Sequence, residues 1–343
     1  MKKVKLTVLT LVLFTSFNAF SQEKKVEEKK FSFSGSIDTY FRTNLNAPND
    51  VNAVAPGSSF ANLPGFSLGM VNLVGAYEGK EVGFVADLVF GPRGEDAVFN
   101  SPVLRPGGSS NIINQLYAYW NVSESVKLTI GNFNTFLGYE VISPTANFNY
   151  STSYLFSYGP FSHTGLKADF TLSEKASLML AVMNPTDATE FNPNGKYAFG
   201  AQFGYAGQFV NFITDDGAFE IDFTGGFDVT DKIFLGINAA HYDNDGVGFT
   251  GFALYPQLTT SDSFKIGLRG EYFKESGNFG AIGTGDADSD VLAATLTGNY
   301  TIGDLTIIPE IRVDTSSNNF FLDGDLAPQN SLSSFLVAAV YKF

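Results

Sequence analysis

Short segments in which apolar and polar residues alternate dominate the chain from residue 31 onward. In the first of them, Phe33, Ile37 and Phe41 fall on one side, and Ser36, Asp38, Tyr40 and Arg42 fall on the other. This two-residue period, in segments rich in Phe, Val, Ile, Tyr and Thr, is typical of β-strands. The pattern predicts sixteen strands, at residues 31–45, 66–78, 81–90, 111–122, 126–139, 162–172, 176–185, 197–206, 209–214, 219–228, 232–243, 251–260, 264–276, 291–302, 305–316 and 332–343.

The predicted connections alternate between long and short along most of the chain. The long ones are residues 46–65, 91–110, 140–161, 186–196, 244–250, 277–290 and 317–331, and the short connection at 215–218 is the one exception. Short turns on the periplasmic side and longer loops on the outer side are the rule for bacterial outer-membrane barrels. The strand number stays open between fourteen, sixteen and eighteen, because segments 162–172, 209–214 and 219–228 are the least certain strand assignments.

The two ends of the sequence support the same interpretation. Residues 1–21 have a positive start, an apolar stretch and small residues at Ala19 and Ser21, which is the pattern of a cleaved signal peptide. Residues 22–30 are highly charged and are expected to form a periplasmic tail. At the other end, an apolar stripe continues at period two to Phe343, as expected of a strand that closes a sheet on itself. We therefore predict an all-β transmembrane antiparallel β-barrel over residues 31–343, located in the outer membrane.

Composition and charge narrow the class of protein. Charged residues make up 16% of the 343 residues, against about 25% in soluble domains. The formal net charge of −14 argues against nucleic acid as a partner, which requires a basic face. There is no cysteine, which excludes a disulfide framework and a thiolate metal site. A soluble β-sandwich is the alternative, and the alternating connection lengths disfavour it.

The alternation also predicts which side chains face the lumen. An arginine on the lipid side near the midplane costs about 2–4 kcal/mol, so the face that carries Asp38 and Arg42 must point inward. The same test gives a predicted pore-lining set of Asp38, Arg42, Asp87, Lys167, Asp169, Lys265, Arg269, Glu271, Glu310, Arg312 and Asp314. We expect these side chains to remain solvated in a water-filled lumen, and a plugged lumen in which they pair is the alternative. Tyr119 and Trp120 each remain candidates for the membrane belt.

The connection 140–161 is rich in aromatic residues, and Glu140 is its only charge. An apolar segment of this kind needs a partner surface. We expect it to fold into the barrel mouth as a constriction that includes Phe148, Tyr150, Tyr154, Phe156 and Tyr158. Extension of the neighbouring strands above the membrane, or packing on a second protomer, are the alternatives.

Three runs of sequence also resemble a known family. They are NQLYAYWN at residues 114–121, LTIGNFNTFLGYEVISP at 128–144 and NFNYSTSYLFSYGPFSHTGLKADF at 147–170. The chain resembles the OmpL-like β-barrel porins found in Bacteroidetes over most of its length, most specifically around residues 150–165. The resemblance implies an outer-membrane channel, with no known catalytic residue and no assigned solute.

The sequence gives little indication of a catalytic site or of a metal site. His163 follows Ser162, and His241 lies near two aspartates, but neither has a nucleophile elbow or an oxyanion donor set. Asp286, Asp288 and Asp290 have the spacing of a calcium loop, but Thr297 stands where its bidentate acid belongs. We therefore predict no enzyme activity, no cofactor and no metal site.

The sequence predicts a porin that lets small hydrophilic solutes or ions diffuse passively across the outer membrane. Its expected partners are outer-membrane lipid and those solutes. Whether it forms a homo-oligomer stays open, because no trimer face is visible in the sequence. The alternative is a closed-lumen barrel that acts as a structural or surface-binding protein, and a planar-bilayer recording distinguishes the two.

Overall fold

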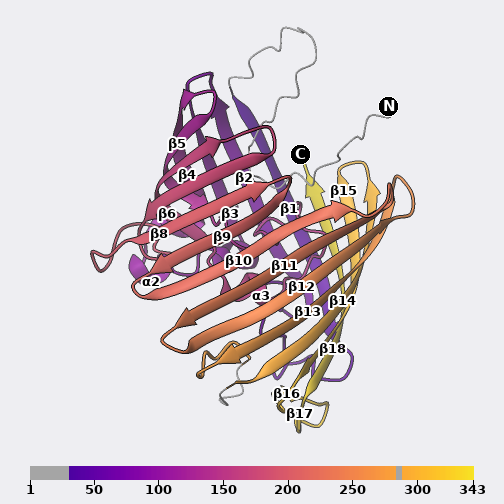
Figure 1. The fold of residues 1–343 in the computed structure, drawn as a ribbon. Coiled ribbons are helices and arrows are strands. Elements are labelled where there is room, and N and C mark those ends of the chain that lie inside the picture. The colour runs from indigo at the N-terminus through magenta and orange to yellow at the C-terminus, as the bar shows by residue number, and fades with distance from the viewer. Residues whose placement is uncertain (1–30, 283–287) are drawn as a thin grey trace.

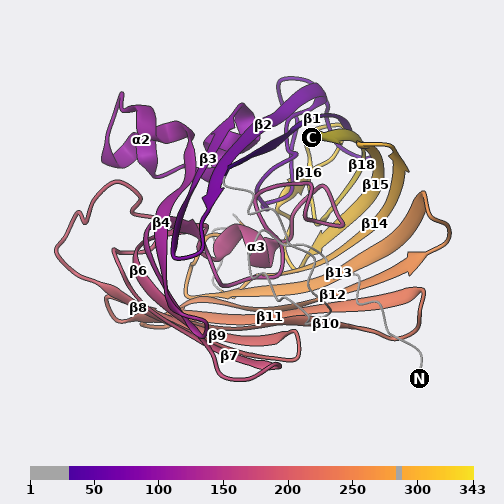
Figure 2. The ribbon, with the colours of Figure 1, turned by 90° about the horizontal axis from the view of Figure 1, so that it is seen from above.

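Sixteen antiparallel strands close into a barrel in the computed structural model, which describes residues 31–282 and 288–343 (Figures 1 and 2). The expected signal peptide at 1–21, the charged tail at 22–30 and Asp286 lie outside the described residues. The barrel strands are β1 (Ser32–Asn44), β2 (Gly65–Glu78), β3 (Val82–Phe90), β4 (Ile113–Ser123), β5 (Val126–Asn134), β6 (Ser162–Thr171), β7 (Ala176–Met183), β8 (Ala198–Tyr205), β9 (Gln208–Asp215), β10 (Ala218–Asp228), β11 (Ile233–Asn244), β12 (Val247–Thr259), β13 (Phe264–Ser276), β14 (Asp290–Ile302), β15 (Leu305–Ser316) and β18 (Ser331–Lys342).

The predicted fold class and the strand number of sixteen are confirmed, and two strand boundaries are corrected. The strand predicted at 126–139 ends at Asn134, because the chain then turns into the barrel interior. The long connection predicted at 244–250 is a two-residue turn at Asp245 and Gly246, which have φ angles of 53° and 86°. Asp-Gly is the preferred pair for a hairpin turn with positive φ at both central positions.

The last strand closes the barrel on the first. In the β1–β18 register, Ser36 lies opposite Lys342. The pairing extends to Phe343, whose backbone N–H donates to the Gly35 carbonyl at 3.0 Å and whose carbonyl accepts from the Gly35 N–H at 3.1 Å. The Phe343 ring lies 6.1 Å from that of Phe33. The aromatic residue at position 343 therefore takes part in the closure.

The outer face of the barrel is apolar. Leu268 on β13 lies opposite Leu296 on β14, and both side chains are exposed. Trp120 is also exposed on this face, whereas Tyr119 alternates to the inner face against Gly83 of β3. This arrangement assigns the membrane-belt position to Trp120.

A charge on the outer face tests its contact with lipid. Leu268 lies near the middle of β13, so we expect Leu268→Arg to lower the free energy of unfolding from lipid vesicles by about 2–4 kcal/mol. Asp262→Arg is the control, because this exposed residue lies in the turn before β13 and is expected to change little. Equal effects of the two substitutions would contradict a lipid-facing surface at Leu268.

The short turns lie at the end of the barrel where β18 ends, and most long connections lie at the opposite end (Figure 1). The long connections contain α1 (Pro92–Ala97), α2 (Ser101–Leu104), the 3-10 helix η1 (Ser109–Ile112), α3 (Tyr154–Tyr158) and the small hairpin of β16 (Phe321–Leu322) and β17 (Pro328–Gln329). Within the described part of the chain, no helix has the length and apolar content needed to cross a bilayer.

Candidate functional site

Residues 135–161, which we call the internal segment, run inside the barrel. Viewed along the barrel, α3 lies within the ring of strands (Figure 2). Ser153 caps this short helix, because its hydroxyl accepts a hydrogen bond from the Phe156 N–H at 3.0 Å. The segment therefore occupies the lumen at the level where a solute would have to pass.

Two glutamates on the barrel wall hold the backbone of the internal segment. Glu310 on β15 accepts from the N–H groups of residues 150 and 151, at 2.6 and 3.0 Å. Glu271 on β13 accepts from the N–H groups of residues 154 and 155, at 3.0 and 2.8 Å. Each carboxylate thus bridges two consecutive backbone donors with charge-assisted hydrogen bonds, which are stronger than neutral ones.

Two arginines on the wall hold the carbonyl groups of the same stretch. Arg269 on β13 donates through Nη1 to the Ser151 carbonyl and to Glu140, both at 2.6 Å. Arg312 on β15 donates through Nη1 to the Thr152 carbonyl at 2.8 Å and pairs with Asp314 through its other nitrogens. The wall therefore presents cations to the carbonyl groups and anions to the N–H groups of one short stretch of backbone.

Connections from other parts of the chain also form hydrogen bonds with the internal segment. Arg93 in α1 donates through Nε to the Ile142 carbonyl at 2.8 Å and through Nη1 to the Tyr150 carbonyl at 3.1 Å. The Tyr158 hydroxyl lies 2.8 Å from the Gly57 carbonyl and 2.7 Å from that of Ala281. Burial raises the pKa of Tyr158 to about 12, so this hydroxyl stays neutral at physiological pH.

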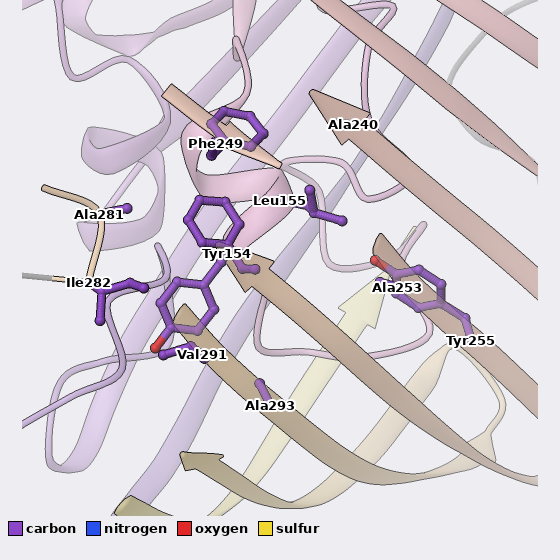
Figure 3. Packing of buried hydrophobic residues seen from close by; sticks show 11 residues of the cluster. Tyr154, Leu155, Ala240, Phe249, Ala253, Tyr255, Ala281, Ile282, Val291 and Ala293 are labelled. Carbon is purple, nitrogen blue, oxygen red and sulfur yellow. The ribbon is translucent and has the colours of Figure 1, made fainter. Parts of the chain in front are cut away.

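An apolar cluster packs around the middle of the internal segment. Figure 3 shows Tyr154 and Leu155 packed among residues of the wall and of the connection that follows β13. The Tyr154 ring lies 5.6 Å from that of Phe273 on β13. Tyr150 is fully buried next to β1, where its hydroxyl donates to Asp38 at 2.5 Å. Packing and polar contacts thus fix the same stretch.

The structure corrects the expected hydration of most predicted pore-lining residues. The eight that are buried are Asp38, Arg42, Asp87, Arg269, Glu271, Glu310, Arg312 and Asp314. The internal segment and neighbouring side chains cover these groups and supply their hydrogen-bond partners, as buried charges require. Lys167, Asp169 and Lys265 keep contact with solvent. That any of the eleven lines an open path stays a prediction.

The five predicted constriction residues also differ in burial. Tyr150, Tyr154 and Phe156 are buried, while Phe148 and Tyr158 are half-buried. The rings of Tyr150, Tyr154 and Phe156 pack on the wall or on the connections. The role of this segment as a constriction stays a prediction.

Some anchoring residues had little sequence signal. Glu140 was visible only as the single charge in an aromatic segment, and Arg93 as an ordinary basic residue in a long connection. Asp87 is surrounded by amide donors from Asn72, Asn114 and Gln115, and the last two are adjacent in sequence. Whether these three side chains lie next to Asp87 depends on the strand register, and the alternation pattern does not determine that register.

The two histidines have no catalytic arrangement. His163 is buried beside Thr135, with its Nε2 3.0 Å from the threonine hydroxyl. His241 lies on the outer face, 2.7 Å from the Thr250 hydroxyl. Within residues 31–282 and 288–343, neither contacts a carboxylate, and no group of three or more acidic or histidine side chains is placed to hold a metal ion.

Comparison with known proteins identifies the architecture. The profile of the family described as "Putative beta-barrel porin-2, OmpL-like" matches residues 30–343. Among solved structures, an anion-selective porin from Comamonas acidovorans is similar, with a TM-score of 0.58, 12% identity, and coverage of 91% of this chain and 99% of that one. Salmonella typhi OmpF in complex with daunomycin gives a TM-score of 0.57 and 10% identity, with coverage of 91% and 97%.

A third similar structure is the trimer form of OmpT from Vibrio cholerae, with a TM-score of 0.51, 12% identity, and coverage of 91% and 99%. At these identities the solved structures establish the fold. No curated protein matches the sequence.

Proposed function

The chain belongs to the OmpL-like β-barrel porin family and is an outer-membrane channel, and we propose that small hydrophilic solutes pass it by diffusion along a narrow route beside the internal segment. The proposal involves no catalytic step, because a channel needs only a polar path in place of the bilayer and a constriction that sets the size limit. A Bacteroidetes origin stays a prediction.

The fixed backbone of residues 150–155 is the observation that carries this proposal. Wall carboxylates accept from the N–H groups of residues 150, 151, 154 and 155, and wall arginines donate to the carbonyl groups of residues 151 and 152. A segment held this closely acts as a permanent obstacle in the lumen. It therefore restricts the size of the passing solute without needing to move.

The solvent-accessible charges of the inner wall suit the entrance of such a route. Lys167 lies 3.5 Å from Asp169 on β6, with side chains that are 15% and 33% exposed. Lys265, near the start of β13, is exposed. We place these three residues at the periplasmic mouth, where both signs of charge keep water in the entrance.

A homo-oligomer is also part of the proposal. One similar structure is a trimer form, and this chain has the same closed-barrel fold. We expect the detergent-extracted protein to have the mass of more than one chain when light scattering is coupled to size-exclusion chromatography. A mass of one chain in several mild detergents would contradict this part of the proposal.

Removing the obstacle tests the channel. We expect the wild-type protein to give stable small steps in planar bilayers, and deletion of residues 146–157 to increase the step conductance severalfold because the lumen widens. Deletion of the exposed loop tip 193–195 is the control and is expected to leave the conductance unchanged. Refolded protein that stays silent would contradict the channel, and a conducting deletion variant with the wild-type step would contradict the obstacle.

A further inference from the structure

A small cavity lies between the internal segment and the wall formed by β10 and β11. Its lining includes Leu137, Phe156 and Gly159 from the segment, and Glu220, Asp222 and Asn238 from the strands. The cavity lies beside the internal segment on the β10–β11 side of the barrel. Its polar lining comes mainly from the wall, and its apolar lining mainly from the segment.

Glu220 faces this cavity as a buried acid without a partner. The residue is 4% exposed, and its carboxyl group forms no hydrogen bond or ion pair with any residue in the described ranges. A carboxylate buried in this way is costly unless a cation or hydrogen-bond donors accompany it. Every other carboxylate discussed at the internal segment has such partners, so Glu220 stands apart from the anchoring groups.

The neighbouring acids have no donors to offer Glu220. Asp222, two residues along the same face of β10, accepts from Asn238 Nδ2 at 2.6 Å, from the Gly138 N–H at 3.1 Å and from Asn211. Asp187 accepts from the N–H groups of residues 161 and 162 at 2.9 and 2.8 Å. Both acids act electrostatically on Glu220. Glu220 and Asp222 both line the cavity, and no basic side chain lines it.

Asp187 adds negative charge under physiological conditions. Burial raises the pKa of its carboxyl group to about 6, so most of it is ionised at neutral pH. Because like charges repel, a positively charged ligand in the cavity would compensate the charges of Glu220 and Asp222.

We propose that the cavity beside Glu220 is a cation subsite of the channel, which takes a small monovalent cation such as an alkali ion or the ammonium group of a solute. This inference rests on the proposed function. The unpartnered carboxyl oxygens supply the acceptors that such a cation needs, and the apolar side chains of Leu137 and Phe156 limit competing water. The donors nearby are already used by Asp222, which leaves none for an anion.

The consequence is a preference for cations along the β10–β11 side of the segment. A cation that meets Glu220 gains a partner beside the internal segment, while a chloride ion is repelled by the carboxyl groups of Glu220 and Asp222. The neutral substitution Glu220→Gln keeps the shape of the side chain and removes this interaction. The buried position then needs no counter-charge, so we expect the variant to fold.

Reversal potentials across a KCl gradient test the subsite. We expect the wild-type channel to prefer potassium over chloride, and Glu220→Gln to lower that permeability ratio severalfold while single-channel steps persist. Glu78→Gln is the matched control, because it removes the same charge from the exposed end of β2 and is expected to change the ratio much less. An unchanged ratio in Glu220→Gln would overturn the subsite and leave the channel intact.

A second measurement uses the wild-type protein alone. With methylammonium chloride in place of KCl, we expect cation current to continue through the channel, because an ammonium group also fits the carboxyl cavity. A wild-type channel that prefers chloride in both salts would overturn the subsite even if Glu220→Gln failed to fold. A wild-type protein that conducts neither salt would instead overturn the proposed function, and the subsite with it.

Discussion

Replacing Glu271 and Glu310 together by alanine is expected to raise the single-channel conductance and to make the current noisy. These two residues accept four backbone hydrogen bonds from residues 150–155, and no other carboxylate contacts those four N–H groups among the described residues. Leaving a buried donor without a partner costs about 1–3 kcal/mol for each group. The internal segment therefore loses much of what holds it across the lumen and samples positions nearer the wall or the mouth.

Planar-bilayer recordings measure this effect directly, with the deletion of residues 146–157 as the upper limit for an unobstructed lumen. Glu275→Ala is the matched control. Glu275 is equally buried on β13, but its carboxyl group accepts from the Ile282 N–H at 3.3 Å, which belongs to a different connection. We expect the control to keep the wild-type step. A folded double variant with the wild-type step and quiet current would show that packing alone fixes the segment.

The barrel itself could be predicted because its two faces meet different solvents. Lipid selects apolar side chains at every second position, and this local signal placed the strands near their observed positions, including β9 and β10. The tight turn at residues 245–246 was overlooked, although Asp-Gly is a strong hairpin signal.

The interior could not be predicted in the same way. Alternation shows that Arg269 and Glu310 point inward, but not whether water or protein covers them. That outcome depends on residues 135–161, which lie far from Arg269 and Glu310 in the sequence. The Arg269–Glu140 pair illustrates the difficulty, since the two residues are 129 positions apart. In the sequence, Glu220 is one more inward-facing acid. Only the structure shows the cavity beside it.

The Arg269–Glu140 pair leads to the second large effect, because we expect Arg269→Met to destabilise the folded barrel by about 3–5 kcal/mol. The Arg269 and Glu140 side chains are 0% and 3% exposed, and their charged atoms lie 2.6 Å apart. Removing the guanidinium leaves the Glu140 carboxylate buried and also leaves the Ser151 carbonyl without its donor. Both penalties act together because the methionine side chain supplies no donor to either group.

Urea unfolding from lipid vesicles measures this loss, and an exposed ion pair provides the contrast. Lys196 and Asp216 also pair, but their side chains are 57% and 48% exposed, so Lys196→Met is expected to cost about 0–1 kcal/mol. Adding Glu140→Gln to Arg269→Met is expected to recover part of the stability, since the unpaired buried charge is then gone. Equal costs for Arg269→Met and Lys196→Met would mean that water reaches the Arg269–Glu140 pair, and that the internal segment does not seal this part of the lumen.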